Sequence, residues 1–203
     1  MEITWYGNSC FALKGRDATV LTDPYTELGG NLPSLKVNLI TLASSIDSGG
    51  KIIKAEGAKI LDWPGEFEVA GIAVEAWEVN GVNVFSFVLD GLHVCHLSGI
   101  QDVLPDSVVE QIGDVDILLI PVGGADLVLN SKQASQVVDA IEPRIVIPMY
   151  FSSEASKLTL NGPEEFLKLV AKPELQAQAS FVIKGRSELP EDKMDFVLLE
   201  AQA

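Results

Sequence analysis

The 203-residue sequence predicts an α/β protein in which two β-sheets pack face to face with helices outside, an αββα sandwich. Three observations lead to this fold class. Short strand-like runs separated by tight turns fill the first half of the chain. Strands alternate with helices in the second half. Near-continuous apolar runs, typical of strands covered on both faces, occur in both halves. We expect a single domain over residues 1–203.

The strands expected in the first half are runs of β-branched, aromatic and aliphatic residues separated by Gly, Asn and Asp. Asn80-Gly81 lies between two such runs and predicts a two-residue hairpin, because both residues tolerate the backbone that this turn requires. The expected strands lie within residues 2–6, 10–13, 18–22, 39–43, 58–63, 72–79, 82–89 and 92–97.

Proline and glycine residues bound the helices expected in the second half. Pro105 suits a first helical turn and Gly113 suits a helix end, while Pro143 stops the second helix. Apolar residues recur at helical spacing inside each segment, so each helix has one face for the core. The expected helices lie within residues 105–113, 130–143 and 161–172, and the apolar strands around them within 116–124 and 144–149.

The charge balance argues against several classes of partner. Asp and Glu outnumber Lys and Arg by 29 to 14, which gives a net charge of −15. Such a surface repels nucleic acid, whose binding depends on Lys and Arg at phosphates, and it repels an anionic membrane for the same reason. No apolar run approaches the ~20 residues of a membrane span, and no secretory signal is visible. We therefore expect a cytoplasmic protein that binds neither nucleic acid nor membrane.

Several motifs occur in an order that matches a known family. They are ITWYGNSCFALKGRDATVLTDPY (3–25), DWPGEFEVAGIAV (62–74), DGLHVCHLSG (90–99), IGDVDILLIPVGG (112–124) and IEPRIVIPMYF (141–151). Together they resemble Zn-dependent hydrolase-like proteins of the metallo-β-lactamase superfamily, in the branch related to ascorbate-lactonase-like proteins. The resemblance covers nearly the whole chain. It implies a metallo-β-lactamase-like αββα sandwich with its site at one edge between the two sheets.

The same resemblance implies that the metal ligands of the family are missing from this sequence. The family holds one or two zinc ions with a His-x-His-x-Asp-His loop, a Gly-His-Ser element, a bridging Asp and a late His. A further His, expected near residues 75–80, is also absent. In this chain the ligand positions fall on Asn8, Ser44, Ile46, Ser48 or Asp47, Gly49, Gly99 and Tyr150.

The histidines give an independent argument against a zinc site. Zinc takes about four N, S or O donors, and the chain has only His93 and His96. Residues three apart in a strand point to opposite faces, so these two cannot share a metal. His93 and Cys95 share a face and could begin a site, but the sequence offers no further ligands. Cys10 and Cys95 are expected to be buried thiols. We therefore expect no metal and no other cofactor.

Five residues remain as candidates for chemistry in the vestigial cleft: Asn8, Asp23, Glu66, His96 and Tyr150. His96 is either a general base or a strand histidine satisfied by a backbone carbonyl. Asp23 stands beside the family's site, or it caps its own turn before a proline. Glu66 belongs either to an acid-base pair with a second Glu two residues later or to a solvated strand face.

Two loop motifs have simple explanations. Ser44 and Ser45 near Asp47 contain a potential nucleophile, but no base is evident, so a polar loop is expected. Gly123 and Gly124 follow a strand without the spacing of a phosphate-binding loop, so we expect them to shape the cleft.

Three functions remain open from the sequence. The first is a pseudoenzyme that binds an unknown protein partner, itself as a homo-oligomer, or a small ligand. The second is a hydrolase of esters, lactones or phosphodiesters, either metal-free through His96, Glu66 and Asn8 or with metal recruited by His93 and Cys95. The third is a structural subunit, for which the aromatic residues Trp63, Trp77 and Phe151 could serve an interface, although we expect them to be buried. The sequence favours the first.

Overall fold

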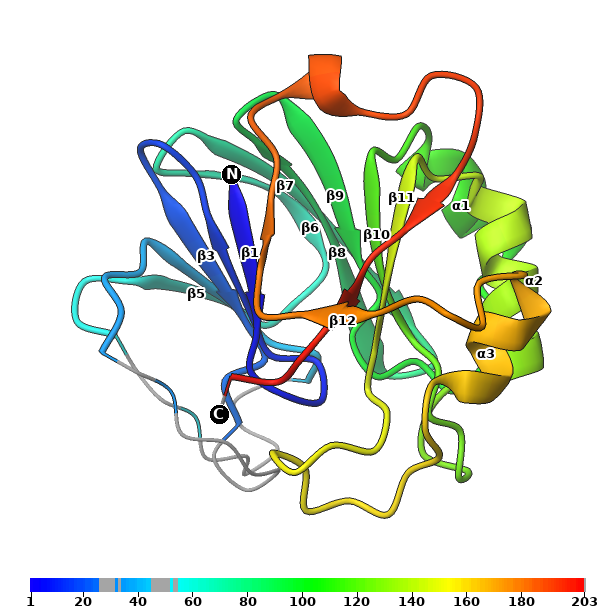
Figure 1. Ribbon diagram of the computed structural model, residues 1–203. Coiled ribbons are helices and arrows are strands. Elements are labelled where there is room, and N and C mark those ends of the chain that lie inside the picture. The colour runs from blue at the N-terminus through cyan, green and yellow to red at the C-terminus, as the bar shows by residue number, and fades with distance from the viewer. Residues whose placement is uncertain (26–31, 33, 45–51, 53–54, 203) are drawn as a thin grey trace.

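The computed structural model describes residues 1–25, 32, 34–44, 52 and 55–202. Two mixed β-sheets pack face to face, and the α-helices lie to one side of them (Figure 1). The first sheet has six strands in the order β13-β1-β2-β3-β4-β5, and the second has seven in the order β14-β11-β10-β9-β8-β7-β6. A short third sheet pairs β12 with β15. The predicted α/β sandwich is confirmed.

The strands follow the apolar runs of the sequence closely. The strands of the six-stranded sheet are β1 (Glu2–Trp5), β2 (Phe11–Lys14), β3 (Thr19–Thr22), β4 (Leu39–Thr41), β5 (Lys59–Leu61) and β13 (Phe181–Val182). Those of the seven-stranded sheet are β6 (Gly65–Val69), β7 (Ile72–Val79), β8 (Val82–Leu89), β9 (Leu92–His96), β10 (Ile117–Pro121), β11 (Ile145–Met149) and β14 (Asp195–Phe196). The third sheet consists of β12 (Ala177–Gln178) and β15 (Leu198–Leu199).

The expected hairpin at Asn80-Gly81 is confirmed, because both residues have positive φ angles and β7 pairs antiparallel with β8 on either side of them. The structure adds two turns of the same kind, Ala70-Gly71 and Asp90-Gly91. Positive φ at both central residues matches the twist of the strands that they join. The four strands β6 to β9 therefore form an uninterrupted meander.

The helices form where the sequence predicts them and cover the seven-stranded sheet (Figure 1). Asn130 caps the longest helix by accepting hydrogen bonds from the backbone N–H groups of Lys132 and Gln133, at 3.1 and 3.0 Å. Gln133 completes a capping box by accepting from the Asn130 backbone. The helices are α1 (Asp106–Ile112), α2 (Ser131–Ile141) and α3 (Glu164–Leu169), with a 3-10 turn at Arg186–Glu188.

The main hydrophobic core fills the space between the two sheets. Trp5 and Phe151 lie at its edge with ring centroids 4.6 Å apart, and Phe85 and Phe87 of β8 are fully buried. The outer face of the six-stranded sheet carries no helix among the described residues. A smaller cluster lies there instead, in which Leu21, Ile40 and their neighbours pack against apolar residues within 32–37 and 52–60.

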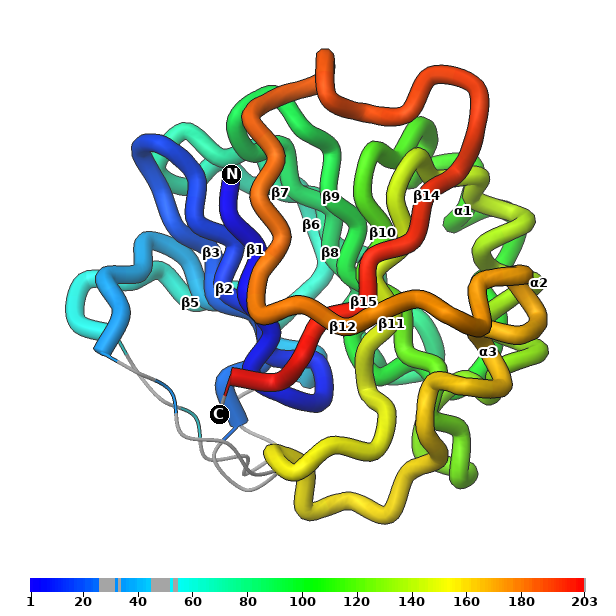
Figure 2. The backbone as a smooth tube through the Cα atoms, viewed as in Figure 1, coloured from blue at the N-terminus to red at the C-terminus, as the bar shows by residue number. Residues whose placement is uncertain are grey.

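The C-terminal segment joins the two sheets, as the orange and red part of the tube shows (Figure 2). After α3 the chain adds β13 antiparallel to β1, and it then adds β14 parallel to β11. The amino group of Met1 donates to the carbonyl oxygen of Ile183 at 2.7 Å, which fixes the chain start to the same segment. Across the described residues, no helix is both long and apolar enough to cross a membrane.

Candidate functional site

The loops that follow several parallel strands meet at one edge of the sandwich and enclose a cavity of about 310 Å³. Tyr25 and Ser44 come from the six-stranded side, and Gly99 and Tyr150 follow β9 and β11. The described lining residues include hydroxyl, amide and apolar groups but no charged side chain. They are Ser9, Tyr25, Ala43, Ser44, Val82, Gly99, Gln101, Leu127 and Tyr150.

Asp23 is buried beside this cavity. Its Oδ1 accepts a hydrogen bond from the backbone N–H of Ala43 at 2.6 Å, whereas no partner lies within hydrogen-bond distance of Oδ2 among the described residues. Burial raises the pKa of the carboxyl to about 7, and the hydrogen bond from the Ala43 N–H lowers it in part. Asp23 is therefore a candidate that titrates near neutral pH, but it does not line the cavity.

His96 is fully buried, and its hydrogen bonds identify its protonation state. Nε2 lies 3.0 Å from the carbonyl oxygen of Ser9, which only accepts, so Nε2 carries the proton. The Ser98 hydroxyl donates to the Asn83 carbonyl at 2.7 Å and therefore has no proton to give to Nδ1, which lies 3.3 Å away. Burial lowers the pKa of the imidazole to about 3. His96 is thus a neutral ring held by a backbone carbonyl.

Tyr150 lies over Gly99, the position at which the family resemblance places a bridging Asp. A Cβ atom placed on Gly99 would lie 3.2 Å from Cε2 of the Tyr150 ring, so a larger side chain at position 99 would compete with the ring for space. Burial raises the pKa of the Tyr150 phenol to about 12, and the charges of Asp23 and Tyr25 act in the same direction. The phenol is therefore protonated at neutral pH and can both donate and accept hydrogen bonds.

Asn8 is buried next to Tyr150. Its Oδ1 accepts from the Ser156 hydroxyl at 2.7 Å. Its backbone oxygen accepts from the Tyr150 N–H at 3.0 Å and from Nε1 of Trp5 at 2.9 Å. These contacts fix the loop after β1 against the end of β11, so Asn8 supports the wall of the cavity.

Four residues around this edge have a left-handed backbone. Asn8, Asp23, Ser98 and Tyr150 have φ angles of 47°, 42°, 51° and 54°. Asn and Asp tolerate this region, but for Ser and Tyr it costs on the order of 1 kcal/mol each. Such residues cluster at ligand sites, where the surrounding structure holds them in place.

The glycine pair after β10 shapes this edge through close packing. A Cβ atom on Gly123 would overlap the backbone oxygen of Tyr150, and Gly124 has a φ of 58°. Gly123 therefore allows the loop after β11 to lie directly against the end of β10.

Other sequence candidates lie elsewhere. The structure does not bring Glu66 to the cavity, because it is an exposed residue of the edge strand β6, directly opposite Glu75 of β7. His93 faces away from His96 and contacts the Ser86 hydroxyl and the Asp114 carbonyl.

The aromatic residues considered for an interface divide between surface and core. Phe151 is buried, and Trp77 is half-buried. The expectation of burial is wrong for Trp63, which is 47% exposed and packs edge-on against Phe67.

The loop in which the resemblance places most of the family's metal ligands begins at Ser44. Ser44 lines the cavity, and its hydroxyl lies 3.1 Å from that of Tyr25. The candidate positions Ser45, Ile46, Asp47, Ser48 and Gly49 lie outside the described residues.

The described residues do not fit the zinc site that the fold family implies. Zinc requires about four donors in a near-tetrahedral shell. No three His, Cys, Asp or Glu side chains come together in the part of the chain that the structure describes. Asp23 offers one carboxylate beside the cavity, the proton on Nε2 of His96 points at a carbonyl, and Tyr150 covers Gly99.

Comparisons with known proteins identify the family. The family described as "Beta-lactamase superfamily domain" matches residues 2–150, so the chain belongs to the metallo-β-lactamase superfamily. A solved structure of a protein from Thermotoga maritima, described as a candidate Zn-dependent hydrolase of that superfamily, superposes with a TM-score of 0.82 at 30% identity. It covers 98% of this chain and 99% of its own, which confirms the metallo-β-lactamase-like fold.

Relatives from archaea carry the name UPF0173. A UPF0173 protein of Pyrococcus furiosus is 26% identical over 85% of this chain and 91% of its own length. A UPF0173 metal-dependent hydrolase of Thermoplasma acidophilum is 29% identical over 83% of this chain and 90% of its own. Several relatives of this chain are thus named metal-dependent hydrolases.

Several lining residues were not predicted from the sequence. Tyr25, Gln101 and Leu127 reach the cavity from three separate loops. Tyr25 directly follows the Asp-Pro turn, which was a usable signal. Gln101 and Leu127 belong to no motif, and their loops come together only because they follow the paired parallel strands β9 and β10.

Proposed function

We propose that this chain is a non-catalytic member of the metallo-β-lactamase superfamily that binds a small ligand in the cavity at the sheet edge. The observation that carries the proposal is the packing of Tyr150 against Gly99. The resemblance places family metal ligands at positions 99 and 150. In this chain position 150 carries the bulky ring of Tyr150, and position 99 is Gly99, which leaves room for that ring. The replacements compensate for each other in volume, as expected if the space now has another use.

Loss of the ligands also removes the means of hydrolysis. A bound metal lowers the pKa of water far enough to supply hydroxide at neutral pH. The described residues offer no equivalent, since a general base must reach the reacting proton and accept it. His96 does not line the cavity and stays neutral, and Glu66 is exposed on another part of the surface. The metal-free hydrolase that uses His96, Glu66 and Asn8 is therefore not favoured.

The lining indicates the chemistry of the ligand. Tyr25, Ser44 and Tyr150 provide hydroxyl groups, Gln101 provides an amide, and Leu127 and Val82 provide apolar surface. Without a charged side chain among the described lining residues, a neutral molecule with several hydrogen-bonding groups fits best. A cavity of about 310 Å³ is at the small end of ligand sites, so the ligand is the size of a single ring or a short chain.

An activity assay tests the loss of catalysis. Wild-type protein is incubated with generic ester, lactone and phosphodiester substrates, with zinc, manganese or iron(II) added separately. We expect no hydrolysis above that of the metal ion alone. Turnover that depends on both protein and metal would overturn the proposal.

A binding assay tests the cavity. Neutral fragments are screened by protein-observed NMR, and we expect hits to shift the backbone amides of residues 43, 99 and 101. Tyr25→Phe should weaken these hits, because it removes a lining hydroxyl. Tyr6→Phe, which alters a tyrosine outside the cavity, should not. If no fragment shifts these amides at millimolar concentration, the cavity is not a binding site.

A further inference from the structure

A second hollow lies on the outer face of the six-stranded sheet, away from the cavity between the sheets. Its volume is about 590 Å³. Among the described residues, the apolar side chains within 32–37 and 55–60, together with Ile52, pack on the part of this face around Leu21 and Ile40. The remaining part exposes the outward side chains of β1, β2 and β3. Its lining is Glu2, Thr4, Tyr6, Ala12, Lys14, Gly15, Arg16, Asp17, Ala18, Thr19, Ser34, Leu35, Lys36 and Asn38.

Strand register places the polar residues of this groove in one row. Lys14 of β2 is opposite Thr19 of β3. The next strand continues the row, because the Thr19 backbone N–H donates to Oδ1 of Asn38 at 2.9 Å and the Asn38 N–H donates to the Thr19 carbonyl at 3.0 Å. Neighbouring strands are about 4.8 Å apart, so Lys14 and Asn38 are separated by about 10 Å. Lys36 lies two residues before Asn38, at the far rim of the row.

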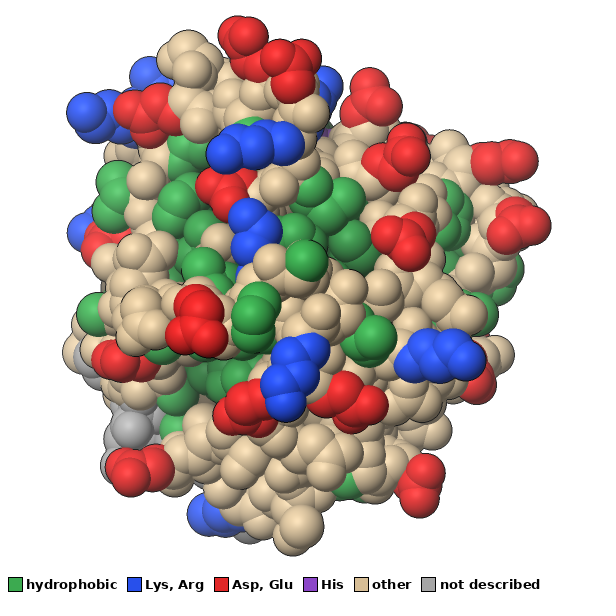
Figure 3. Space-filling model, turned by 45° about the vertical axis from the view of Figure 1, so that its right-hand side comes forward, with side chains coloured by type: hydrophobic (Ala, Val, Ile, Leu, Met, Phe, Trp, Pro, Cys, Tyr) green, Lys and Arg blue, Asp and Glu red, His purple; other side chains and the backbone are tan. Residues whose placement is uncertain are grey.

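The charge of this groove differs from that of the molecule, because its described lining carries no excess of acids. Acidic side chains are spread over the face that Figure 3 shows, and the whole chain has 29 acids to 14 bases. The groove lining has three bases, Lys14, Arg16 and Lys36, and two acids, Glu2 and Asp17. Bases from two separate segments thus gather at one place on an acidic protein, which favours an anion there.

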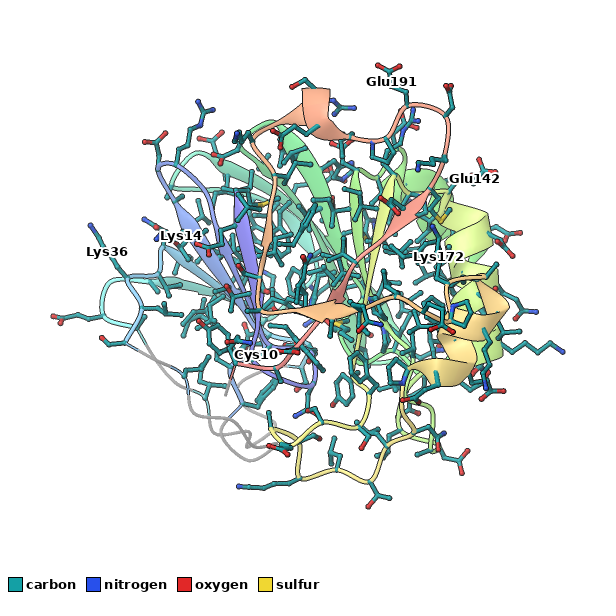
Figure 4. The ribbon with its side chains drawn as sticks, viewed as in Figure 1. Cys10, Lys14, Lys36, Glu142, Lys172 and Glu191 are labelled. Atoms are coloured by element: carbon teal, nitrogen blue, oxygen red, sulfur yellow. The ribbon has the colours of Figure 1, made fainter. Side chains whose placement is uncertain are left out.

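Two of these bases are available to a ligand. Arg16 is engaged with Asp90, whose carboxylate lies 3.7 Å from Nε and accepts from the Arg16 backbone N–H. Lys14 and Lys36 are exposed, and within the described residues neither has an ion pair, although Glu2 of β1 lies directly opposite Lys14 in the sheet. Both project from the side of the molecule that the six-stranded sheet forms (Figure 4). Each lysine has a long, flexible side chain, so both ammonium groups can turn towards the space above Thr19.

The floor adds neutral donors between the two ammonium groups. Asn38 uses its side-chain oxygen within the sheet, which leaves its NH₂ group for a ligand. The hydroxyls of Thr4, Thr19 and Tyr6 belong to the same lining. We propose that this groove binds a small organic anion, whose phosphate or carboxylate groups lie between Lys14 and Lys36. Two free cations are too few for nucleic acid, whose binding relies on many phosphate contacts.

Calorimetric titration at low ionic strength tests this site with pyrophosphate and citrate as probes. We expect at least one probe to bind the wild type, and its affinity to fall roughly three- to tenfold in each of Lys14→Gln and Lys36→Gln. The double variant should lose more than about tenfold, and added salt should weaken wild-type binding. Lys132→Gln is the matched control, because Lys132 is exposed on α2, on the other side of the molecule, and should leave the affinity unchanged.

Three results would overturn the assignment. One is the absence of binding by both probes at about 10 mM, far above a useful affinity. Another is equal affinity in the wild type and the double variant. The third is tight binding of a hexaglutamate peptide without binding of either probe, which would indicate an acidic protein segment as the partner instead. The cavity variants Tyr25→Phe and Tyr150→Phe should not change the titration, so the groove is tested independently of the proposed ligand cavity.

Discussion

Replacing Asp23 by Asn should make the protein more stable at neutral and alkaline pH. The amide has the shape of the carboxyl, and its oxygen can still accept the hydrogen bond from Ala43. The substitution removes only the negative charge of the carboxylate, which burial makes unfavourable. The expected gain therefore depends on pH, which distinguishes it from a change in packing.

The magnitude follows from the pKa of Asp23, which burial raises from 3.8 to about 7. Between these values the unfolded chain has lost the proton and the folded protein keeps it. The free energy of unfolding of the wild type therefore falls by about 1.4 kcal/mol per pH unit as the pH rises, and it levels off above about pH 8. From pH 5 to 8 the expected loss is roughly 2–3 kcal/mol, and Asp23→Asn should lack it.

His96 acts in the opposite direction over part of this range. Its folded pKa is about 3, so the folded protein keeps it neutral while the unfolded chain takes up a proton below about pH 6.5. Stability from His96 is therefore present above about pH 6.5 and is lost as the pH falls towards 3. Wild type and variant share this contribution, so it cancels in their difference.

The assay is urea unfolding of wild type and Asp23→Asn at several pH values from about 5 to 8.5, above the sequence pI of about 4.4. The difference in unfolding free energy should grow with pH and reach a plateau. Asp139→Asn, at an exposed position on α2, is the control and should show no comparable trend. A difference between Asp23→Asn and wild type that stays constant across the range would refute the reasoning.

Two further changes test local features. Gly123→Ala should lower the unfolding free energy by roughly 3 kcal/mol or more, since its Cβ would overlap the Tyr150 backbone, whereas Gly91→Ala, whose Cβ meets nothing within 4 Å, should cost only about 1 kcal/mol. Equal effects would show that the close packing after β10 is unimportant. Asn130→Ala should cost about 1 kcal/mol by removing the cap of α2, compared with little change in the exposed Gln136→Ala. Chemical denaturation measures all four, and an unchanged midpoint for Asn130→Ala would contradict the capping role.

The sequence predicts the strands and helices well because their signals are local. Apolar alternation marks β7 and β8, Asn80-Gly81 marks the turn between them, and proline and glycine bound the helices. Edge strand β6 was not predicted as a separate strand, since its outward residues are charged and only one face is partly buried. The two-residue strands β12 to β15 have almost no pattern to detect, and only pairing with distant strands defines them.

The site was predictable only where a motif carries it. The resemblance leads to Asn8, Asp23, His96 and Tyr150, and the structure places all four around the same edge. It could not reveal that the Tyr150 ring lies over Gly99, because these residues are 51 positions apart and their contact depends on the packing of parallel strands. The groove on the outer face of the six-stranded sheet is hidden for the same reason, since Lys14 and Lys36 come to line it together only through sheet register.

The metal content of the purified protein tests the central claim most directly. The protein is produced in medium supplemented with zinc, iron and manganese, separated from free ions by gel filtration, and measured by elemental mass spectrometry. We expect less than about 0.1 equivalent of each metal, because the described residues supply too few donors for a site. One or two equivalents of any of these metals, retained through gel filtration and lost with a chelator, would contradict the account.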